Sequence, residues 1–457
     1  MTRWLFVAYT FAAAGLAVAQ DRFPVDRAAI LEGLRLRDAA IITYHAPQDL
    51  PDFFTVVIEA PGRALAVELW KYSNRAPGYQ LLIQREDGVI EKCEPGPVST
   101  YRGAVIDDAG TTAAAAFVGG KLTLSIRHAD GQWEYLQAAT DGDPAAAVDQ
   151  YVLYRGVDII PVPGAECGHT NTGKMPSEEA PTNIASWFLR VRIAYDADFE
   201  FYQANGSSVV NTEADINAVQ NAVNIVYERD ARITHLVNSI LVRTNSSDPY
   251  TSSDPETLLN QFRTEWNDNR RGIVRDIAHL MTGRNLNGSI IGVAWLNGIC
   301  ASTTNGFGYG LSQSRFSTTF ADRVALTAHE LGHNWSVEHC NEMMPPVTPC
   351  NIMCSGLGGC DGYGSPNFDR WSIGIIQTYA NTRNCVTPDT GVTWLDFNFG
   401  GFETGSFTNP FNTFAEAMSA APAFGTIAVK PGSRFETGSY NEPMSIESFG
   451  GTASIGR

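Results

Sequence analysis

The sequence predicts an α/β domain over residues 187–387, with a mixed sheet packed by helices, preceded by a mostly β segment and followed by a short β segment. Three observations support this division. In the central part, β-prone runs alternate with helix-period patterns, which is typical of helices covering a sheet. Residues 20–180 and 390–457 instead contain short β-prone runs separated by turn residues. A chain of 457 residues is long enough for about three domains.

The elements of the central part follow from hydrophobic periodicity. The predicted strands are 187–195, 233–242 and 290–296. The predicted helices are 212–230, 255–266, 322–335 and 372–379. In the first helix, apolar residues recur at i, i+3 and i+4 spacing. The second helix has a start signal, because Asp254 is a suitable N-cap and Pro255 occupies the first helical position.

The N-terminal segment shows hairpin-like spacing. Its predicted strands are 53–58, 64–70, 79–83, 112–118, 122–126 and 133–136. Glycine, aspartate and proline separate them, which favours a β-sandwich. Residues 168–186 are polar, contain two prolines and lack periodicity, so they are expected to form a linker. Lys174 is the only basic residue of this linker, so a paired-basic processing signal is absent from it.

The extreme N-terminus resembles an export signal. Arg3 precedes an apolar run over residues 4–16, and Ala17-Val18-Ala19 has the form of a cleavage site before Gln20. We therefore expect residues 1–19 to be a signal peptide and the mature protein to be secreted, with no transmembrane segment. The net charge of −17 argues against nucleic acid or anionic membranes as partners.

A histidine motif lies on the third predicted helix. His329 and His333 are four residues apart, so both imidazoles can reach one metal ion from the same helix face. Glu330 follows the first histidine and can lie near the same ion without binding it. His339 follows six residues later, and it can be a third ligand only if the helix ends and the chain turns back. Three imidazoles and one open position make a catalytic zinc site, whereas the alternative is a solvated helix with scattered histidines.

The stretch from His329 to His339 resembles the signature of the metzincin zinc endopeptidases, H-E-x-x-H-x-x-G-x-x-H followed by a methionine turn. Met353, fourteen residues after His339, stands where that Met-turn is expected, although an ordinary core methionine is the alternative. Residues 278–283 and 292–300 are similar to the adamalysin (reprolysin) branch. The resemblance covers residues 187–387.

Two positions depart from the family pattern. Ser336 stands where the family usually has glycine, and Cys340 replaces the aspartate that usually follows the third histidine. Because the chain must leave the helix and fold His339 back, we expect Ser336 to adopt a positive φ, at a cost of about 1 kcal/mol. These departures affect the subfamily and leave the proposed ligands intact.

The resemblance implies a metzincin-like fold and a zinc-dependent endopeptidase. Zinc would supply hydroxide at neutral pH, and Glu330 would act as general base. The strand 290–296 would pair with an extended protein or peptide substrate, and the loop 355–371 would form a wall of the pocket. The alternative is a non-catalytic secreted binding or adhesive protein with a structural or degenerate metal site. Structural calcium and oligomeric state are not specified by the sequence.

The N-terminal segment also resembles a reprolysin propeptide. The similarity lies in Tyr101 to Val105, a following small-residue strand, Gly119-Gly120 and a strand with tryptophan and tyrosine. Residues 20–180 are therefore expected to be a propeptide and the protein a zymogen. An accessory binding domain is the alternative.

Eight cysteines in an exported chain predict disulfides. By resemblance to reprolysins, Cys300 and Cys385 are expected to form one bridge. Cys340, Cys350, Cys354 and Cys360 allow three pairings, of which we favour Cys340–Cys350 with Cys354–Cys360. Zinc binding by Cys350, Cys354 and Cys360 is the competing interpretation.

Cys167 has a separate interpretation, because it lies near the end of the expected propeptide and is followed by glycine, as the cysteine-switch residue of reprolysin propeptides is. A thiolate in the fourth position of the zinc ion would exclude water. A Cys93–Cys167 bridge is the alternative favoured by parity, and a surface thiol is the third.

The tail over residues 390–457 resembles the opening turns of a parallel β-helix. The similarity rests on the runs 410–417, 425–429 and 441–446. Only about two short rungs are visible, whereas stacked coils need roughly three repeats for stability. A truncated array, a capped remnant and a β-sandwich tail remain open.

Overall fold

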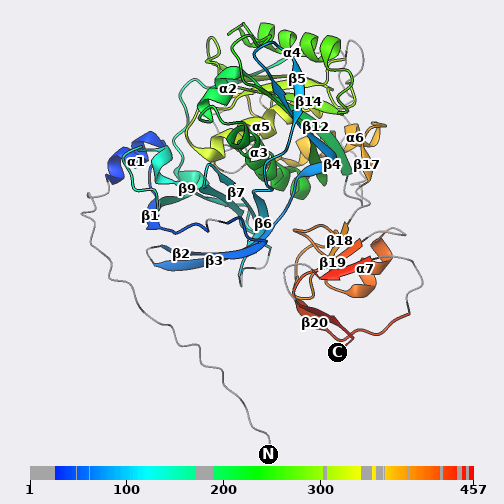
Figure 1. Ribbon diagram of the computed structural model, residues 1–457. Coiled ribbons are helices and arrows are strands. Elements are labelled where there is room, and N and C mark those ends of the chain that lie inside the picture. Colours follow the sequence, from blue (N-terminus) through cyan, green and yellow to red (C-terminus); the bar gives the residue numbers. More distant parts are fainter. Residues whose placement is uncertain are drawn as a thin grey trace, which may run out of the picture.

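A computed structural model describes the chain in five parts: an α/β centre, a curled β-sheet, two edge additions and a small tail (Figure 1). The described residues are 26–47, 49–60, 62–106, 108, 110–170, 189–301, 306–340, 352–356, 364, 366–388, 392–421, 426–439, 445–448 and 452–456. The expected signal peptide and most of the expected linker lie outside them. No helix in the described part is long and apolar enough to cross a membrane.

The central sheet is mixed, as predicted. Its strands are β12 (Leu189–Ala197), β13 (Ile233–Arg243), β14 (Ile277–Thr282), β15 (Ile290–Trp295) and β16 (Tyr309–Gln313). They lie in the order β15-β16-β14-β12-β13, and β15 alone runs antiparallel to its neighbour within this set. The short β17 (Thr387–Pro388) pairs with the start of β12. Within this set of five strands, β15 lies at one edge and β13 at the other.

Helices cover both faces of this sheet. They are α2 (Phe199–Ala204), α3 (Val209–Asp230), α4 (Pro255–Asn269), α5 (Phe320–Asn334) and α6 (Arg370–Asn381). The apolar sides of α3, α5 and α6 share one core with the sheet, and α4 packs in another core with the opposite sheet face. The predicted start of α4 is confirmed, because the Asp254 side chain accepts a hydrogen bond from Thr257 N at 2.9 Å and Pro255 is at the first position.

The N-terminal region is mostly β, as predicted, but it forms one curled sheet instead of a two-sheet sandwich. After α1 (Arg27–Gly33), this sheet has the order β1-β10-β9-β8-β7-β6-β3-β2. Its strands are β1 (Ala40–Thr43), β2 (Phe53–Ala60), β3 (Arg63–Lys71), β6 (Thr100–Val105), β7 (Thr112–Val118), β8 (Lys121–Arg127), β9 (Trp133–Ala138) and β10 (Gln150–Arg155). Residues from the first and last strands of this order, Ile42 and Val56, belong to one core. The curled sheet therefore encloses a single core between its own strands, as the two sheets of a sandwich would.

Three strands of the N-terminal region are not part of the curled sheet and instead extend the central sheet. The strands β4 (Arg75–Gln84) and β5 (Ile90–Cys93) continue it beyond β13, and β11 (Glu166–Thr170) continues it beyond β15. In Figure 1 the blue strands β4 and β5 lie among the green elements of the central domain. This exchange was not predicted, because pairing between distant parallel strands has no local sequence signal.

The tail forms a small parallel ladder. The strands β18 (Val392–Leu395), β19 (Thr426–Val429) and β21 (Ser445–Ser448) pair in parallel, and so do β20 (Gly432–Arg434) and β22 (Ala453–Ile455). The helix α7 (Phe414–Ala420) packs on this ladder through a core that includes Phe414, Ile427 and Val429. Parallel pairing of successive strands is the arrangement that stacked coils require.

Candidate metal centre

The helix α5 places the first two histidines. His329 and His333 lie one turn apart on the same side of the helix, and both are fully buried. Their Nε2 atoms are 3.0 Å apart. In a tetrahedral zinc site with bonds of ~2.0–2.1 Å, two nitrogens lie about 3.3 Å from each other. The spacing of the two imidazoles therefore fits a shared ion.

The end of α5 returns the third histidine to the same place. The helix ends at Asn334, and Ser336 has φ of 80°, which confirms the predicted positive φ. Val337 N donates to Gly332 O at 3.0 Å and Ser336 N to His333 O at 2.8 Å, which is a Schellman-type helix end. His339 is thereby brought back, with its ring 4.7 Å from the His333 ring.

Backbone carbonyls orient the first two imidazoles. His329 Nδ1 lies 2.5 Å from Ile352 O, and His333 Nδ1 lies 2.7 Å from Val337 O. Because a carbonyl only accepts, Nδ1 of each ring is the donor, which leaves the Nε2 lone pair directed to the centre. Sequence reasoning missed both carbonyls, since a backbone acceptor has no residue signature.

The turn containing Met353 lies directly against α5. A Cβ at Gly332 would be 2.4 Å from the Met353 sulfur, so glycine is required where the helix passes over this side chain. Cys340 N donates to Met353 O at 2.8 Å, and Cys340 is bridged to Cys354. The pairing that we favoured from the sequence, Cys340–Cys350 with Cys354–Cys360, is therefore wrong. The turn folds back onto the chain after His339 and brings Cys354, with a Cα–Cα separation of 4.7 Å, to Cys340.

The remaining cysteines divide between the described residues and those outside them. Cys300 is bridged to Cys385, which ties the chain after β15 to the chain after α6. Cys350 and Cys360 lie outside the described residues. Cys354 is in a disulfide, so it is not a ligand in the competing zinc cluster of Cys350, Cys354 and Cys360. The Cys93–Cys167 bridge is not formed.

Cys167 lies in the centre itself. It belongs to β11, which pairs in parallel with β15, and its sulfur is 3.4 Å from His333 Nε2. One ligand atom each from Cys167, His329, His333 and His339 lies within 4.8 Å of the others, and all four residues are buried. This set of one sulfur and three nitrogens could hold a metal ion, and its donor types suit zinc.

Glu330 lies between the histidines and the sheet edge. Its Oε1 accepts a hydrogen bond from the Cys167 thiol at 2.8 Å. A Cβ at Gly292 in β15 would be 2.2 Å from Glu330 Oε1, so this strand position has to be glycine for the carboxylate to fit. Burial raises the pKa of Glu330 well above its usual range, and the bond from Cys167 acts in the opposite direction. A glycine inside an apolar strand is a signal of such a close approach.

Asn334, the last residue of α5, is a further residue that the sequence did not reveal. Its side-chain amide donates to Trp295 O at 2.9 Å and to Tyr309 O at 3.0 Å. It therefore joins the histidine helix to the last residue of β15 and the first residue of β16. These two hydrogen bonds fix the position of β15 and β16 relative to the helix that carries His329 and His333.

Fold and site together define a metallopeptidase domain, because a helix carrying paired histidines lies beneath the edge strand of a mixed sheet and next to a buried carboxylate. Residues 189–384 match the Reprolysin_5 model, described as metallo-peptidase family M12. This part of the chain is therefore a reprolysin-like metzincin domain of that family.

Curated proteins similar to the chain include two metalloproteinases. Disintegrin and metalloproteinase domain-containing protein 33 of Homo sapiens is 24% identical over 351 residues, which is 74% of this chain and 41% of the relative. Snake venom metalloproteinase trimerelysin-2 of Protobothrops flavoviridis is 42% identical over 64 residues, which is 14% of this chain and 30% of the relative. The chain thus spans less than half the length of each of these curated relatives.

Proposed function

We propose that the protein is a secreted zinc-dependent endopeptidase made as a zymogen. The observation that carries this proposal is the buried group of His329, His333, His339 and Cys167, with Glu330 in contact with the cysteine. The proposed parts are a signal peptide (1–19), a propeptide (20–180), the metallopeptidase domain (187–387) and a tail that begins a parallel β-helix (390–457).

His329, His333 and His339 would hold the zinc ion. Zinc bound by three imidazoles supplies Lewis acidity and hydroxide at neutral pH. Glu330 would accept the proton of the attacking water and deliver it to the leaving amine.

The strand β15 would hold the substrate. In the structure β11 occupies this place: it pairs with β15 on one side, and on the other side Cys167 N donates to Ser355 O at 3.2 Å. A backbone segment therefore fits between β15 and residues 355–356, in the extended form that β-addition of a peptide requires. We propose a protein or peptide substrate in the same cleft, with residues 355 and 356 on its outer side. Much of the wall expected from the sequence, residues 357–363 and 365, lies outside the described residues.

The N-terminal region would keep the enzyme latent through Cys167. As a thiolate, Cys167 would take the fourth position of the ion, where water has to bind for hydrolysis. Because Cys167 is part of β11, the strand that fills the proposed substrate cleft would also block the fourth position of the ion. Removal of β11 would open the fourth position and the substrate strand together.

The proposal is tested with zinc-loaded protein cut between residues 171 and 188. Digestion of casein or of a quenched peptide is expected, and o-phenanthroline should abolish it and added zinc restore it. Full-length protein should be much less active. Zinc-loaded, folded and cut protein that hydrolyses neither substrate would contradict the proposed activity.

A further inference from the structure

The central sheet carries strands of the N-terminal region at both edges, and the two attachments differ in kind. β4 packs in both large cores of the central domain, whereas β11 contributes only to one small apolar cluster beside β15. We propose that β4 is a permanent strand of the metallopeptidase core, so that the N-terminal region stays bound after the chain is cut between residues 171 and 188. The inference relies on the proposed function only for the place of this cut.

Side chains of β4 enter both cores of the central domain. Leu81 is 1% exposed and belongs to the core that contains α3 and α5. Leu82 is 6% exposed and packs in the core on the opposite sheet face, together with Leu241 and Tyr250. Successive residues of a strand point to opposite faces, so β4 fills an internal position of the sheet on both sides. Withdrawal of β4 would leave an apolar hole in each core.

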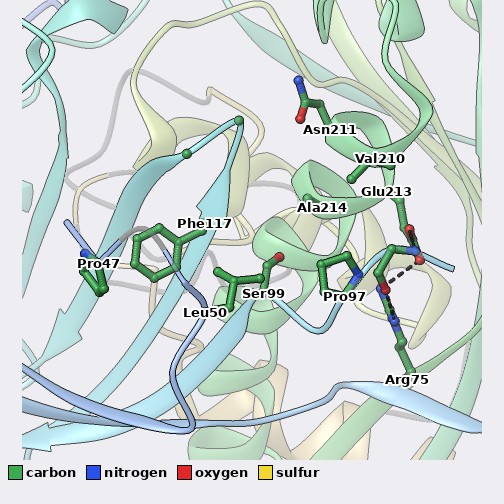
Figure 2. A pocket seen from close by; sticks show the side chains of 13 residues that line it. Pro47, Leu50, Arg75, Pro97, Ser99, Phe117, Val210, Asn211, Glu213 and Ala214 are labelled. Carbon is green, nitrogen blue, oxygen red and sulfur yellow. Dashed lines mark hydrogen bonds and ion pairs between the residues drawn. The ribbon is translucent and has the colours of Figure 1, made fainter.

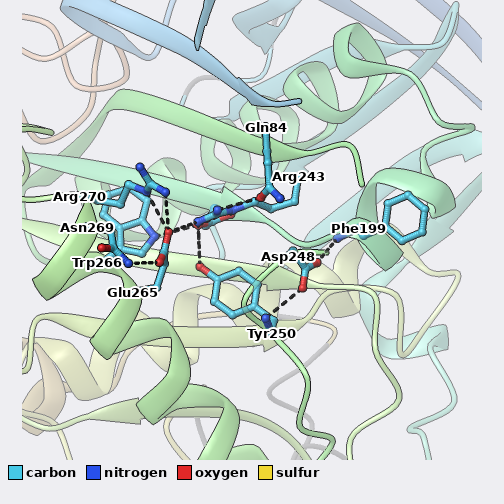
Figure 3. A network of polar contacts seen from close by, with 10 residues as sticks. Gln84, Phe199, Arg243, Asp248, Tyr250, Glu265, Trp266, Asn269 and Arg270 are labelled. Carbon is cyan, nitrogen blue, oxygen red and sulfur yellow. Dashed lines mark hydrogen bonds and ion pairs between the residues drawn. The ribbon is translucent and has the colours of Figure 1, made fainter. Parts of the chain in front are cut away.

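A buried polar network is completed by β4. Arg243 at the end of β13 is 1% exposed and binds Asp196 and Glu265, with Nη2 2.7 Å from Asp196 Oδ2 and 3.1 Å from Glu265 Oε1. Its Nη1 donates to Gln84 Oε1 at 2.9 Å (Figure 3). Gln84 thus supplies a neutral acceptor and closes the network on the side of the N-terminal region. Without it, a buried guanidinium would lose an acceptor and its cover.

The exposed edges of β13 and β5 would differ in character, which also supports a permanent place for β4 in the sheet. If β4 left, the segment Ser239–Arg243 of β13 would present its N–H and C=O groups, with Ile240, Leu241 and Val242 at its centre. Such a long apolar edge is prone to pair with other chains. In the structure the outermost strand is instead β5, which is short and carries Glu91 and Lys92. Charged residues on a short edge strand are the usual protection, so the sheet is finished at β5.

A second set of contacts holds the same region to α3. Glu213 accepts hydrogen bonds from Arg75 Nη2 at 2.8 Å, Tyr79 OH at 2.9 Å and Gly96 N at 2.7 Å. Figure 2 shows Arg75 and Glu213 beside a cavity that lies between the first turns of α3 and Phe117 of the curled sheet. Arg75 and Tyr79 of β4 thus bind one buried carboxylate of α3 together with Gly96 from the chain after β5, at the opposite end of β4 from Gln84.

The attachment of β11 is much weaker. It has Cys167 and Gly168 where β4 has leucines, and Glu166 at its start is exposed. A Cβ on Gly168 would make only ordinary contacts, so no close packing fixes the strand there. Cys167 packs in a small apolar cluster with Ala165, Ile291, Ala325 and Leu326, so withdrawal of β11 would open this cluster and leave the two main cores of the domain closed. Activation would then consist of the withdrawal of β11 alone, while β4 and β5 stay in the sheet.

The experiment uses the full chain with the recognition sequence of a site-specific protease inserted between residues 171 and 188. After cleavage, both fragments should elute together from a sizing column at micromolar concentration without denaturant. Separate elution of the N-terminal fragment, with a remaining fragment that keeps its circular dichroism and melting temperature, would overturn the inference.

Three variants of the cleavable chain locate the attachment. Leu82→Ala and Gln84→Ala should each raise the dissociation constant of the fragments about tenfold or more. Lys92→Ala is the matched control, because Lys92 lies opposite Leu82 on the exposed edge, and it should change that constant less than about twofold. Equal dissociation constants in all three variants would show that β4 does not hold the fragments together.

Association is measured without substrate, so it separates this inference from the proposed activity. Fragments that stay together yet hydrolyse no peptide would contradict the peptidase and leave the permanent strand standing. Active enzyme from which the N-terminal fragment has separated would do the reverse.

Discussion

The thiol of Cys167 lies 2.8 Å from the Oε1 atom of Glu330. One side chain of the N-terminal region thus contacts the proposed general base, and it lies 3.4 Å from Nε2 of His333 as well. The contact is buried and comes from a strand that occupies the proposed substrate position. The proposed latency and the proposed catalysis rest on two different residues in contact, so single substitutions of Cys167 and Glu330 can separate the two roles.

Cys167→Ala should raise the peptidase activity of the full-length protein, because no thiolate then fills the fourth position of the ion. Activity of the protein after removal of β11 should stay the same. Cys93→Ala is the control, since Cys93 lies in β5 at the far edge of the sheet. Equal latency of Cys167→Ala and wild type would show that the region inhibits through other contacts.

Glu330→Gln should keep zinc and the fold but lower kcat by about 10²-fold or more, because the base is lost while the metal ligands stay. Zinc content is measured on the same samples by elemental analysis. A variant that hydrolyses peptide at the wild-type rate would rule out Glu330 as the base.

Ser336→Gly should stabilise the protein by about 1 kcal/mol. It relieves the cost of positive φ on a non-glycine residue and removes a buried hydroxyl, which has no hydrogen-bond partner among the described residues, although added freedom of the unfolded chain offsets part of the gain. Urea denaturation measures the change. Ser336→Ala keeps the strained φ and removes only the hydroxyl, so it should gain less; an equal gain in both variants would contradict the strain.

Replacing Cys340 and Cys354 together by alanine should weaken zinc binding, because this bridge fixes the residue after His339 to the residue after Met353. The matched control replaces Cys300 and Cys385. It should cost about 2–5 kcal/mol of stability with little effect on the zinc affinity of the folded protein. Competition with a chelating dye measures affinity, and equal affinities in the two double variants would refute the positioning role.

Acid should destabilise the fold in part through His235. Burial lowers the pKa of His235 to about 3, and its Nε2 accepts a hydrogen bond from Trp335 Nε1 at 3.0 Å. In the unfolded chain the pKa is about 6.5, so between these values the unfolded state binds more protons. Stability from this group is complete above pH ~6.5 and falls by about 1.4 kcal/mol per unit as the pH drops further toward 3.

The measurement compares urea unfolding of wild type and His235→Gln from pH 7 to pH 4.5. Glutamine can still accept from Trp335 but does not titrate, so the variant should show a shallower loss toward acid pH. Both proteins share the titration of the metal ligands, which cancels in the difference. Parallel curves would show that His235 does not contribute to acid lability.

Local features of the sequence determined much of the central domain. The period of the apolar residues in α3, the aspartate–proline start of α4 and the histidine spacing of α5 all follow from residues a few positions apart. These patterns are readable because a helix that buries one side needs apolar residues at that period, whatever it packs against. The requirement that His339 fold back likewise implied the positive φ at Ser336.

Tertiary structure alone decided which distant segments meet. Nothing in residues 75–93 shows that they complete a sheet begun by β12 and β13, since a strand pairs through its backbone and any open edge of suitable length can accept it. The partner of Cys340 depended on a turn that brings Cys354 to it, and bridge formation requires that proximity. The acceptors of His329 and His333 are carbonyls, which every residue carries. The sequence by itself thus determined the chemical groups of the site, and the packing of two chain regions decided how they are held and covered.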